Sequence, residues 1–168
     1  MDDLSNNARS HRRRMDAGVP PGRGPERLAG GAASLHADRD DLHRLVDVAD
    51  FYFRSENFLA ALESYTRALG LLPRTAGTER GLIELKVARC PQARGNFQAA
   101  LKHVDEAKAL LRSSRDPVQL GKIFALRGNI LLQMARYDRA QRYCELAYKL
   151  LRGTGENATL GELELSLG

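Results

Sequence analysis

The stretch Glu56-Asn57-Phe58-Leu59-Ala60-Ala61 recurs twice later in the chain, as Gly95-Asn96-Phe97-Gln98-Ala99-Ala100 and as Ala135-Arg136-Tyr137-Asp138-Arg139-Ala140. In each copy an aromatic residue stands three positions before the last alanine, and that alanine falls at positions 61, 100 and 140. Another alanine follows at positions 68, 107 and 147. Steps of 39 and 40 residues, kept at several separate positions, indicate an internal structural repeat.

Apolar residues around these stretches follow the three-and-four spacing of amphipathic helices. The first copy predicts two helices, with apolar stripes at Leu42, Leu45, Val46, Ala49, Tyr52 and Phe53 and at Phe58, Ala61, Leu62, Tyr65, Ala68, Leu69 and Leu72. We therefore expect an all-α fold, a right-handed solenoid of antiparallel helix pairs. The repeats are expected near residues 42–75, 81–115 and 117–153, with a partial fourth at 157–168, in one domain over residues 38–168.

Several residues predict where the helices begin and end. Asp38 can cap the first helix, and Asp116 followed by Pro117 suits the start of the third pair. Pro73 ends the second helix, since proline cannot continue the hydrogen-bond ladder. A proline inside a helix costs roughly 3 kcal/mol, so Pro91 predicts a helix that is bent or cut short near residue 90.

Residues 1–37 are predicted to be a disordered tail. Gly18 to Pro25 and Gly30-Gly31 are rich in helix breakers, and the segment holds few large apolar residues. Basic and acidic side chains balance in residues 1–41, so the net charge of +5 belongs to the rest of the chain. We interpret the cluster Arg12–Arg14 as part of a solvated tail. The alternative is a contact for nucleic acid or an anionic membrane.

The repeated units resemble the tetratricopeptide repeat (TPR) family. The first unit matches its pattern of small, aromatic and closing residues at Ala49, Tyr52, Ala61, Tyr65, Ala68 and Pro73. The chain departs from the pattern at Pro91, which replaces the aromatic residue, and at Arg112 and Arg152, which replace the closing proline. Its period also exceeds the usual length of about 34 residues. In these respects the chain looks like the long-period arrays of bacterial regulators and large signalling proteins.

The resemblance implies a groove lined by the first helix of each pair, where a partner peptide or helix binds. The residues that it places there are Val46, Asp50, Phe53, Arg54, Leu85, Arg89, Gln92, Lys122, Asn129 and Gln133. The arginines, the lysine and the amides suit a peptide's carboxylates and backbone. One subclass binds acidic chaperone tails through a lysine and an asparagine on its first helix. Val46 and Asp50 stand there, so this clamp is not expected.

The last residues of the chain predict one more helix, capped by Asn157 or Thr159 and carrying Leu160, Leu163, Leu165 and Leu167. The alternation over residues 163–167 also permits a strand. If the register holds, this helix has no second helix to cover it. We therefore expect either that the chain is a fragment of a longer protein or that a second copy covers Leu160, Leu163 and Leu167.

No motif in the sequence indicates an enzyme, a metal site or a cofactor. His11 and His36 lie in the expected tail, and His43 and His103 are interpreted as surface residues. Cys90 and Cys144 lack the spacing of metal ligands and are interpreted as free thiols in a reducing compartment. No apolar run approaches the roughly 18 residues that span a membrane, and no signal peptide is present. We expect a cytoplasmic protein.

The primary hypothesis for function is a protein–protein interaction scaffold or adaptor. One alternative is the sensor or regulatory segment of a larger bacterial transcriptional or signalling regulator. The repeat region is mildly basic, so a third hypothesis is nucleic-acid binding, which we do not expect, because mild basicity does not establish it. The expected partner is a protein or peptide.

Overall fold

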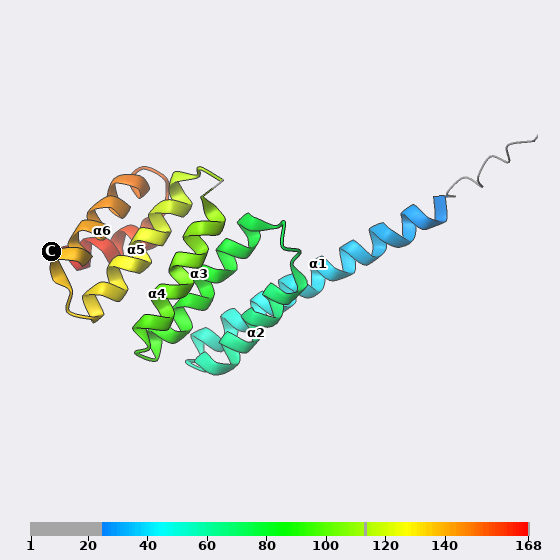
Figure 1. The fold of residues 1–168 in the computed structure, drawn as a ribbon, viewed down its shortest axis with the longest axis horizontal. Coiled ribbons are helices and arrows are strands. Elements are labelled where there is room, and N and C mark those ends of the chain that lie inside the picture. Colours follow the sequence, from blue (N-terminus) through cyan, green and yellow to red (C-terminus); the bar gives the residue numbers. More distant parts are fainter. Residues whose placement is uncertain (1–24, 113, 168) are drawn as a thin grey trace, which may run out of the picture. The chain divides into compact units, whose positions relative to one another are not determined.

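The computed structural model describes residues 25–112 and 114–167, with side chains from residue 39 to residue 164 apart from 113. The chain divides by its contacts into two units, residues 1–35 and 36–168. The described residues form helices α1 (Pro25–Arg54), α2 (Phe58–Leu71), α3 (Gly77–Ala93), α4 (Phe97–Leu111), α5 (Pro117–Gln133), α6 (Tyr137–Leu151) and α7 (Asn157–Leu167). In the second unit they pack as antiparallel pairs (Figure 1), so the predicted all-α repeat fold is confirmed.

The internal repeat is visible in the ends of the helices. The first helices of the three pairs end at Arg54, Ala93 and Gln133, which are 39 and 40 residues apart. In two pairs an asparagine caps the second helix. Asn57 accepts a hydrogen bond from the backbone N–H of Ala60 at 3.3 Å, and Asn96 accepts one from that of Ala99 at 3.2 Å. The repeat period seen in the sequence is thus also the period at which the helices end and begin.

Helix α1 begins earlier than the sequence predicts. It starts at Pro25, where proline's fixed φ suits the first turn, and it continues through Gly30-Gly31. Asp38 therefore lies inside the helix, so its predicted role as a cap is wrong. The remainder of the expected tail, including Arg12–Arg14, lies outside the described residues. Local glycines do not stop a helix whose other residues are good helix formers.

Pro91 does not cut α3 short near residue 90, so that part of the prediction is wrong. The helix runs to Ala93, which is equivalent in the repeat to Arg54 and Gln133. The proline sits in the last turn, where it removes a single backbone hydrogen bond donor. It is also buried. The contacts that pack the end of α3 therefore outweigh the local cost.

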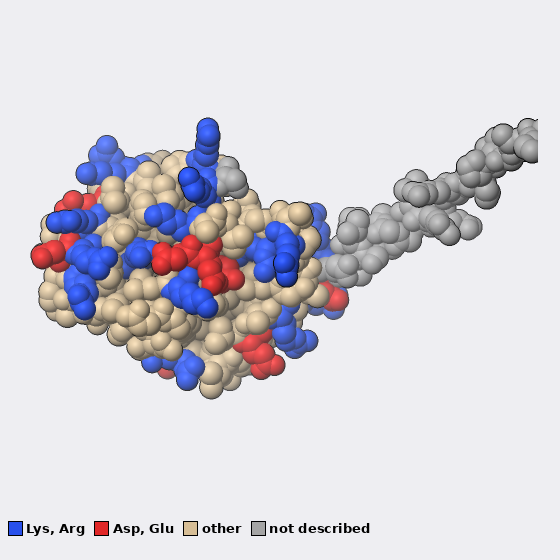
Figure 2. Space-filling model, viewed as in Figure 1, with Lys and Arg blue, Asp and Glu red and all other residues tan. Residues whose placement is uncertain are grey.

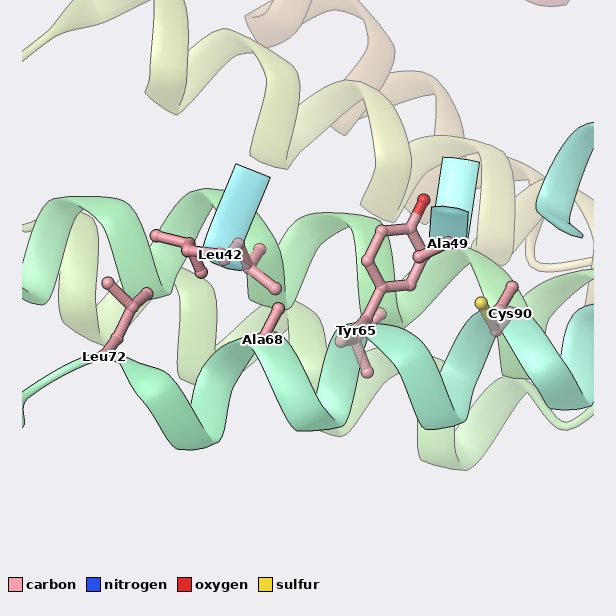
Figure 3. Close-up of a cluster of buried hydrophobic side chains, with 9 residues drawn as sticks. Leu42, Ala49, Tyr65, Ala68, Leu72 and Cys90 are labelled. Carbon is pink, nitrogen blue, oxygen red and sulfur yellow. The ribbon is translucent and has the colours of Figure 1, made fainter. Parts of the chain in front are cut away.

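The core consists of three clusters along the array, each shared by neighbouring pairs. In the first, Ala49, Ala61 and Ala68 have no exposed surface, and Tyr65, Leu72 and Cys90 fill the space around them (Figure 3). The second cluster joins α3, α4 and α5, and the third joins α5, α6 and α7. Alanine at the contact points lets the helix backbones approach closely, and the larger residues pack between them.

Helix α7 confirms the helical reading of the last segment over the alternative of a strand. Leu163 is only 3% exposed and belongs to the third core cluster, with Leu160 packed against it. The expectation that Leu163 is exposed for self-association is therefore wrong, because α5 and α6 of the same chain cover it. The side chain of Leu167 lies outside the described residues. None of the described helices combines the length and apolar character needed to cross a membrane.

The turn between the two helices of each pair generates a test of the repeat geometry. One residue in each turn has a left-handed backbone, with φ of 58° at Glu56, 75° at Gly95 and 55° at Ala135. Only glycine adopts this conformation without steric cost. We expect Ala135→Gly to raise the free energy of unfolding by roughly 0.5–1 kcal/mol and Gly95→Ala to lower it by a similar amount. Urea denaturation measures both. Changes of the same sign would contradict the equivalence of the turns.

Candidate peptide-binding groove

A hollow of about 550 Å³ lies where α1, α2 and α3 meet. Most of the groove residues predicted on the first pair line it. The lining side chains are Asp50, Phe53, Arg54, Glu56, Phe58, Tyr65, Lys86, Arg89 and Ala93. The structure thus brings together Asp50, Phe53 and Arg54 of α1 with Arg89 of α3. Val46 is half-buried, and Leu85 is buried at 9% exposure, so Leu85 contributes to the core and not to the groove.

Asp50 is the most heavily bonded residue of the hollow. The ammonium Nζ of Lys86 donates to its two carboxylate oxygens at 2.8 and 2.6 Å, and the hydroxyl of Tyr65 donates to its Oδ1. Burial raises the pKa of Asp50, but the hydrogen bonds from Lys86 and Tyr65 outweigh burial and leave that pKa below its ordinary value. Asp50 is therefore ionised at neutral pH, and Lys86 neutralises it.

The same contact affects Tyr65. Burial, followed by its hydrogen bond to Asp50, raises the pKa of Tyr65 well above the ordinary value. Tyr65 therefore stays protonated and keeps donating to the carboxylate. Sequence reasoning identified Tyr65 only as a packing residue of the repeat and missed Lys86. The sequence gives little indication that Lys86 pairs with Asp50, because the two residues lie 36 positions apart.

Two arginines of the hollow remain available. The guanidinium of Arg89 lies over the ring of Phe53, 4.8 Å from its centroid, and Phe53 packs edge-on against Phe58 at 5.4 Å. Arg54 and Arg89 are exposed. Within residues 39–112 and 114–164 neither forms an ion pair. Two guanidinium groups beside an aromatic surface are suited to bind a carboxylate together with an adjoining apolar side chain.

Further along, the predicted amide residues meet one another. The side-chain Nε2 of Gln92 on α3 donates to Oδ1 of Asn129 at 3.2 Å and to Oε1 of Gln133 at 3.3 Å, both on α5. Gln92 is one helical turn beyond Arg89, so the amides continue the surface that the arginines begin. We call the surface made of Phe53, Arg54, Arg89, Gln92, Asn129 and Gln133 the first-helix groove.

Lys122 does not join the first-helix groove as predicted. Its Nζ lies 2.8 Å from the carboxylate Oε1 of Glu156, just before α7. This ion pair joins the first half of α5 to the segment that leads into the last helix. Lys122 is half-buried, so its charge is already compensated within the chain, and a partner would have to compete with Glu156 for it.

One cluster elsewhere has the donor types of a metal site. Glu84 of α3 and His103 and Glu106 of α4 place one ligand atom each within 4.8 Å of one another. The ring Nδ1 of His103 lies 2.8 Å from Oε2 of Glu84, which is buried at 8% exposure. His103 is thus half-buried, and its interpretation as a surface residue is wrong. The pair of Glu84 and His103 links α3 to α4, and this contact between helices explains why both side chains are placed there.

The two cysteines are free, as expected, and both are fully buried and not half-buried. Burial raises the pKa of Cys90 to about 11 and also raises the pKa of Cys144. Both groups are therefore thiols at neutral pH. Since the thiolate is the reactive form, neither cysteine is poised as a nucleophile.

The Asp50 contacts predict a pH-dependent contribution to stability. Asp50→Ala leaves Lys86 and Tyr65 without their acceptor and should lower the free energy of unfolding by about 1–3 kcal/mol at pH 7. Because the folded pKa is lowered from 3.8, this contribution is present above that value and is lost as the pH falls through the folded pKa. Chemical denaturation from pH 7 to acid measures it.

The matched control is Asp47→Ala, which removes an exposed carboxylate from the same helix. We expect it to change the free energy of unfolding by less than about 0.5 kcal/mol. The interpretation is wrong if the difference between the Asp50 variant and wild type stays constant down to acid pH.

No protein-family model matches the chain, and none of the curated proteins matches it. Among solved structures, the chain is similar to the TPR domain of Sgt2 from Aspergillus fumigatus, with a TM-score of 0.58 and 20% identity, covering 74% of this chain and 76% of that chain. The similarity concerns the fold and does not support a regulator-like variant. The chain has the fold of a TPR domain.

Proposed function

We propose that the protein is an interaction scaffold whose first-helix groove binds an extended segment of a partner protein. The proposal rests on how positive and negative side chains are distributed in the hollow. Asp50 pairs with Lys86 at 2.6 Å, whereas Arg54 and Arg89 beside it form no ion pair in the described part of the chain, although Arg54 also attracts the carboxylate of Asp50. The hollow is lined by the basic side chains of Arg54, Lys86 and Arg89 and by the acidic side chains of Asp50 and Glu56, which leaves one net positive charge next to an aromatic surface.

The chemistry of the groove defines the expected segment. A carboxylate side chain would bind between Arg54 and Arg89, and charge-assisted hydrogen bonds to guanidinium are among the stronger polar contacts. A neighbouring apolar side chain would cover Phe53 and Phe58. The amides of Gln92, Asn129 and Gln133 would then pair with the peptide backbone, since amides both donate and accept. A short acidic segment with one large apolar residue fits this order.

The alternative of nucleic-acid binding receives less support from the array. Figure 2 shows acidic side chains among the basic ones on the face in view. A phosphate backbone is best bound by a continuous basic stripe. The ion pairs Lys86–Asp50, Lys122–Glu156 and Arg127–Asp105 each compensate a basic side chain of the array within the chain.

Selection of peptides from a random displayed library tests the proposal. We expect the selected peptides to carry Asp or Glu next to an aromatic or leucine residue. Reversing both groove charges, with Arg54→Glu and Arg89→Glu, should weaken binding of a selected peptide by at least about tenfold, because two attractive contacts become repulsive. Isothermal titration measures the affinity, and the loss should be smaller at high salt.

The control is Arg142→Glu, which reverses an exposed arginine on α6, away from the groove. This variant should bind the selected peptide as wild type does. The proposal is overturned if the double variant retains full affinity, or if the selected peptides show no acidic preference.

A further inference from the structure

Three side chains of the second pair, Glu84 of α3 and His103 and Glu106 of α4, face one another and are not part of the first-helix groove. Their ligand atoms all lie within 4.8 Å of one another. Nδ1 of His103 lies 2.8 Å from Oε2 of Glu84 and 3.6 Å from Oε2 of Glu106. His103 and Glu106 are three residues apart on one helix, a spacing that places both on the same side of α4. One nitrogen and two oxygen donors therefore meet between the two helices.

The repeat fold does not require polar side chains at these positions. The link between α3 and α4 explains where Glu84 and His103 lie, but it does not explain why a carboxylate is used. In the third pair the equivalent residues, each 40 positions later, are Phe124 and Tyr143, whose ring centroids are 5.7 Å apart. Glu84 is only 8% exposed, and a buried charge is costly unless it is compensated. The second pair thus carries a buried carboxylate where another pair uses an aromatic contact.

The charges around this carboxylate favour a divalent cation. Two carboxylates face one imidazole, and a protonated His103 would balance only one of them. Lys102 lies 3.9 Å from Oε1 of Glu106, the oxygen that faces away from the cluster's contact with His103. The side chain of Lys102 is 76% exposed, so water screens this pair and it contributes little. A doubly charged ion between the three donors would balance both carboxylates.

The donor types and their spacing fit zinc. Imidazole nitrogen and carboxylate oxygen both bind Zn²⁺ at about 2.0–2.2 Å. Two ligand atoms of a tetrahedral zinc ion are then about 3.3 Å apart, and the two distances from Nδ1 differ from this value by about half an ångström or less. The side chain of Glu106 is 43% exposed, so it has room to adjust. Ca²⁺ and Mg²⁺ prefer oxygen ligands alone.

We propose that Glu84, His103 and Glu106 bind a zinc ion that joins α3 to α4. Three protein ligands leave the fourth position to water, which is the arrangement of an open zinc site. Glu106 also lines an open hollow that extends along α4 to Arg127 of α5, so an ion can reach the site from solvent. Sequence reasoning missed the site, because Glu84 and His103 lie 19 positions apart on different helices.

Titration of the full chain with Zn²⁺, after a chelator has removed bound metal, tests the proposal. Isothermal titration should show a single saturable site, and an excess of Ca²⁺ or Mg²⁺ should not displace the zinc. The thermal midpoint of unfolding should rise with the zinc concentration, because a ligand that binds only the folded state stabilises it. Co²⁺ in place of zinc should give the intense visible absorption of four-coordinate cobalt.

Three conservative variants locate the site. His103→Gln, Glu84→Gln and Glu106→Gln each remove one ligand and keep a polar side chain. Each should weaken zinc binding by more than about tenfold, since the loss of a group that merely orients a ligand already weakens metal binding by about 10- to 100-fold. Glu106 has the most exposed side chain of the three, so its variant keeps the test valid if a change at the buried Glu84 prevents folding.

The matched control is His43→Gln, which removes an exposed histidine of α1 and should bind zinc as wild type does. The double groove variant of Arg54 and Arg89 should also bind zinc normally, which separates this site from the first-helix groove. The proposal is overturned if wild type shows no saturable binding, or if His103→Gln or Glu106→Gln leaves the affinity unchanged. Binding that His43→Gln abolishes, or that Ca²⁺ displaces, would mean an adventitious ion only and would also overturn it.

Discussion

The repeat array depends on the close approach of helices at positions whose side chains are no larger than a methyl group. The point is clearest at Gly128, where even a Cβ atom would lie 2.6 Å from the sulfur of Cys144 and 3.3 Å from its backbone nitrogen. Since interiors pack at the density of organic crystals, a larger side chain here would have to move a helix. Larger residues are thereby confined to the spaces between contact points, and charged residues to the edges of the helices.

This confinement explains the groove. Asp50 stands where a carboxylate is partly withdrawn from water, and an unpaired buried charge would be costly. Lys86 and Tyr65 compensate it from the two neighbouring helices, so the carboxylate holds α1, α2 and α3 together. Of the arginines one turn further on, Arg54 also favours the ionised form of Asp50, and Arg89 lies over the ring of Phe53. Under the proposed function, the residues that stabilise the array and the residues that bind a partner would be neighbours in the same hollow.

The features that could be predicted from the sequence are those with short-range causes. Helices α2 and α4 begin beside Asn57 and Asn96, whose caps act over three residues, and the alanine spacing reports the contact positions directly. The position of Arg54 and Arg89 beside the hollow followed from the same register. Contacts between distant segments could not be predicted. Lys86 forms its ion pair with Asp50 across 36 residues of sequence. Leu163 is buried by α5 and α6, and the sequence around Leu163 alone predicted that it would be exposed. Pro91 misled for a related reason, because the packing of its neighbours decided where α3 ends.

The placement of the two cysteines has a consequence for following the array as it opens. Cys90 is sealed between the first and second pairs, and Cys144 is sealed beneath the last helix. A thiol-modifying reagent reaches either sulfur only when its own junction separates, since both are essentially inaccessible. The two cysteines therefore report separately on the opening of two junctions, one near each end of the described pairs. Their labelling rates would reveal whether the array comes apart from its first pair, from its last helix, or all at once.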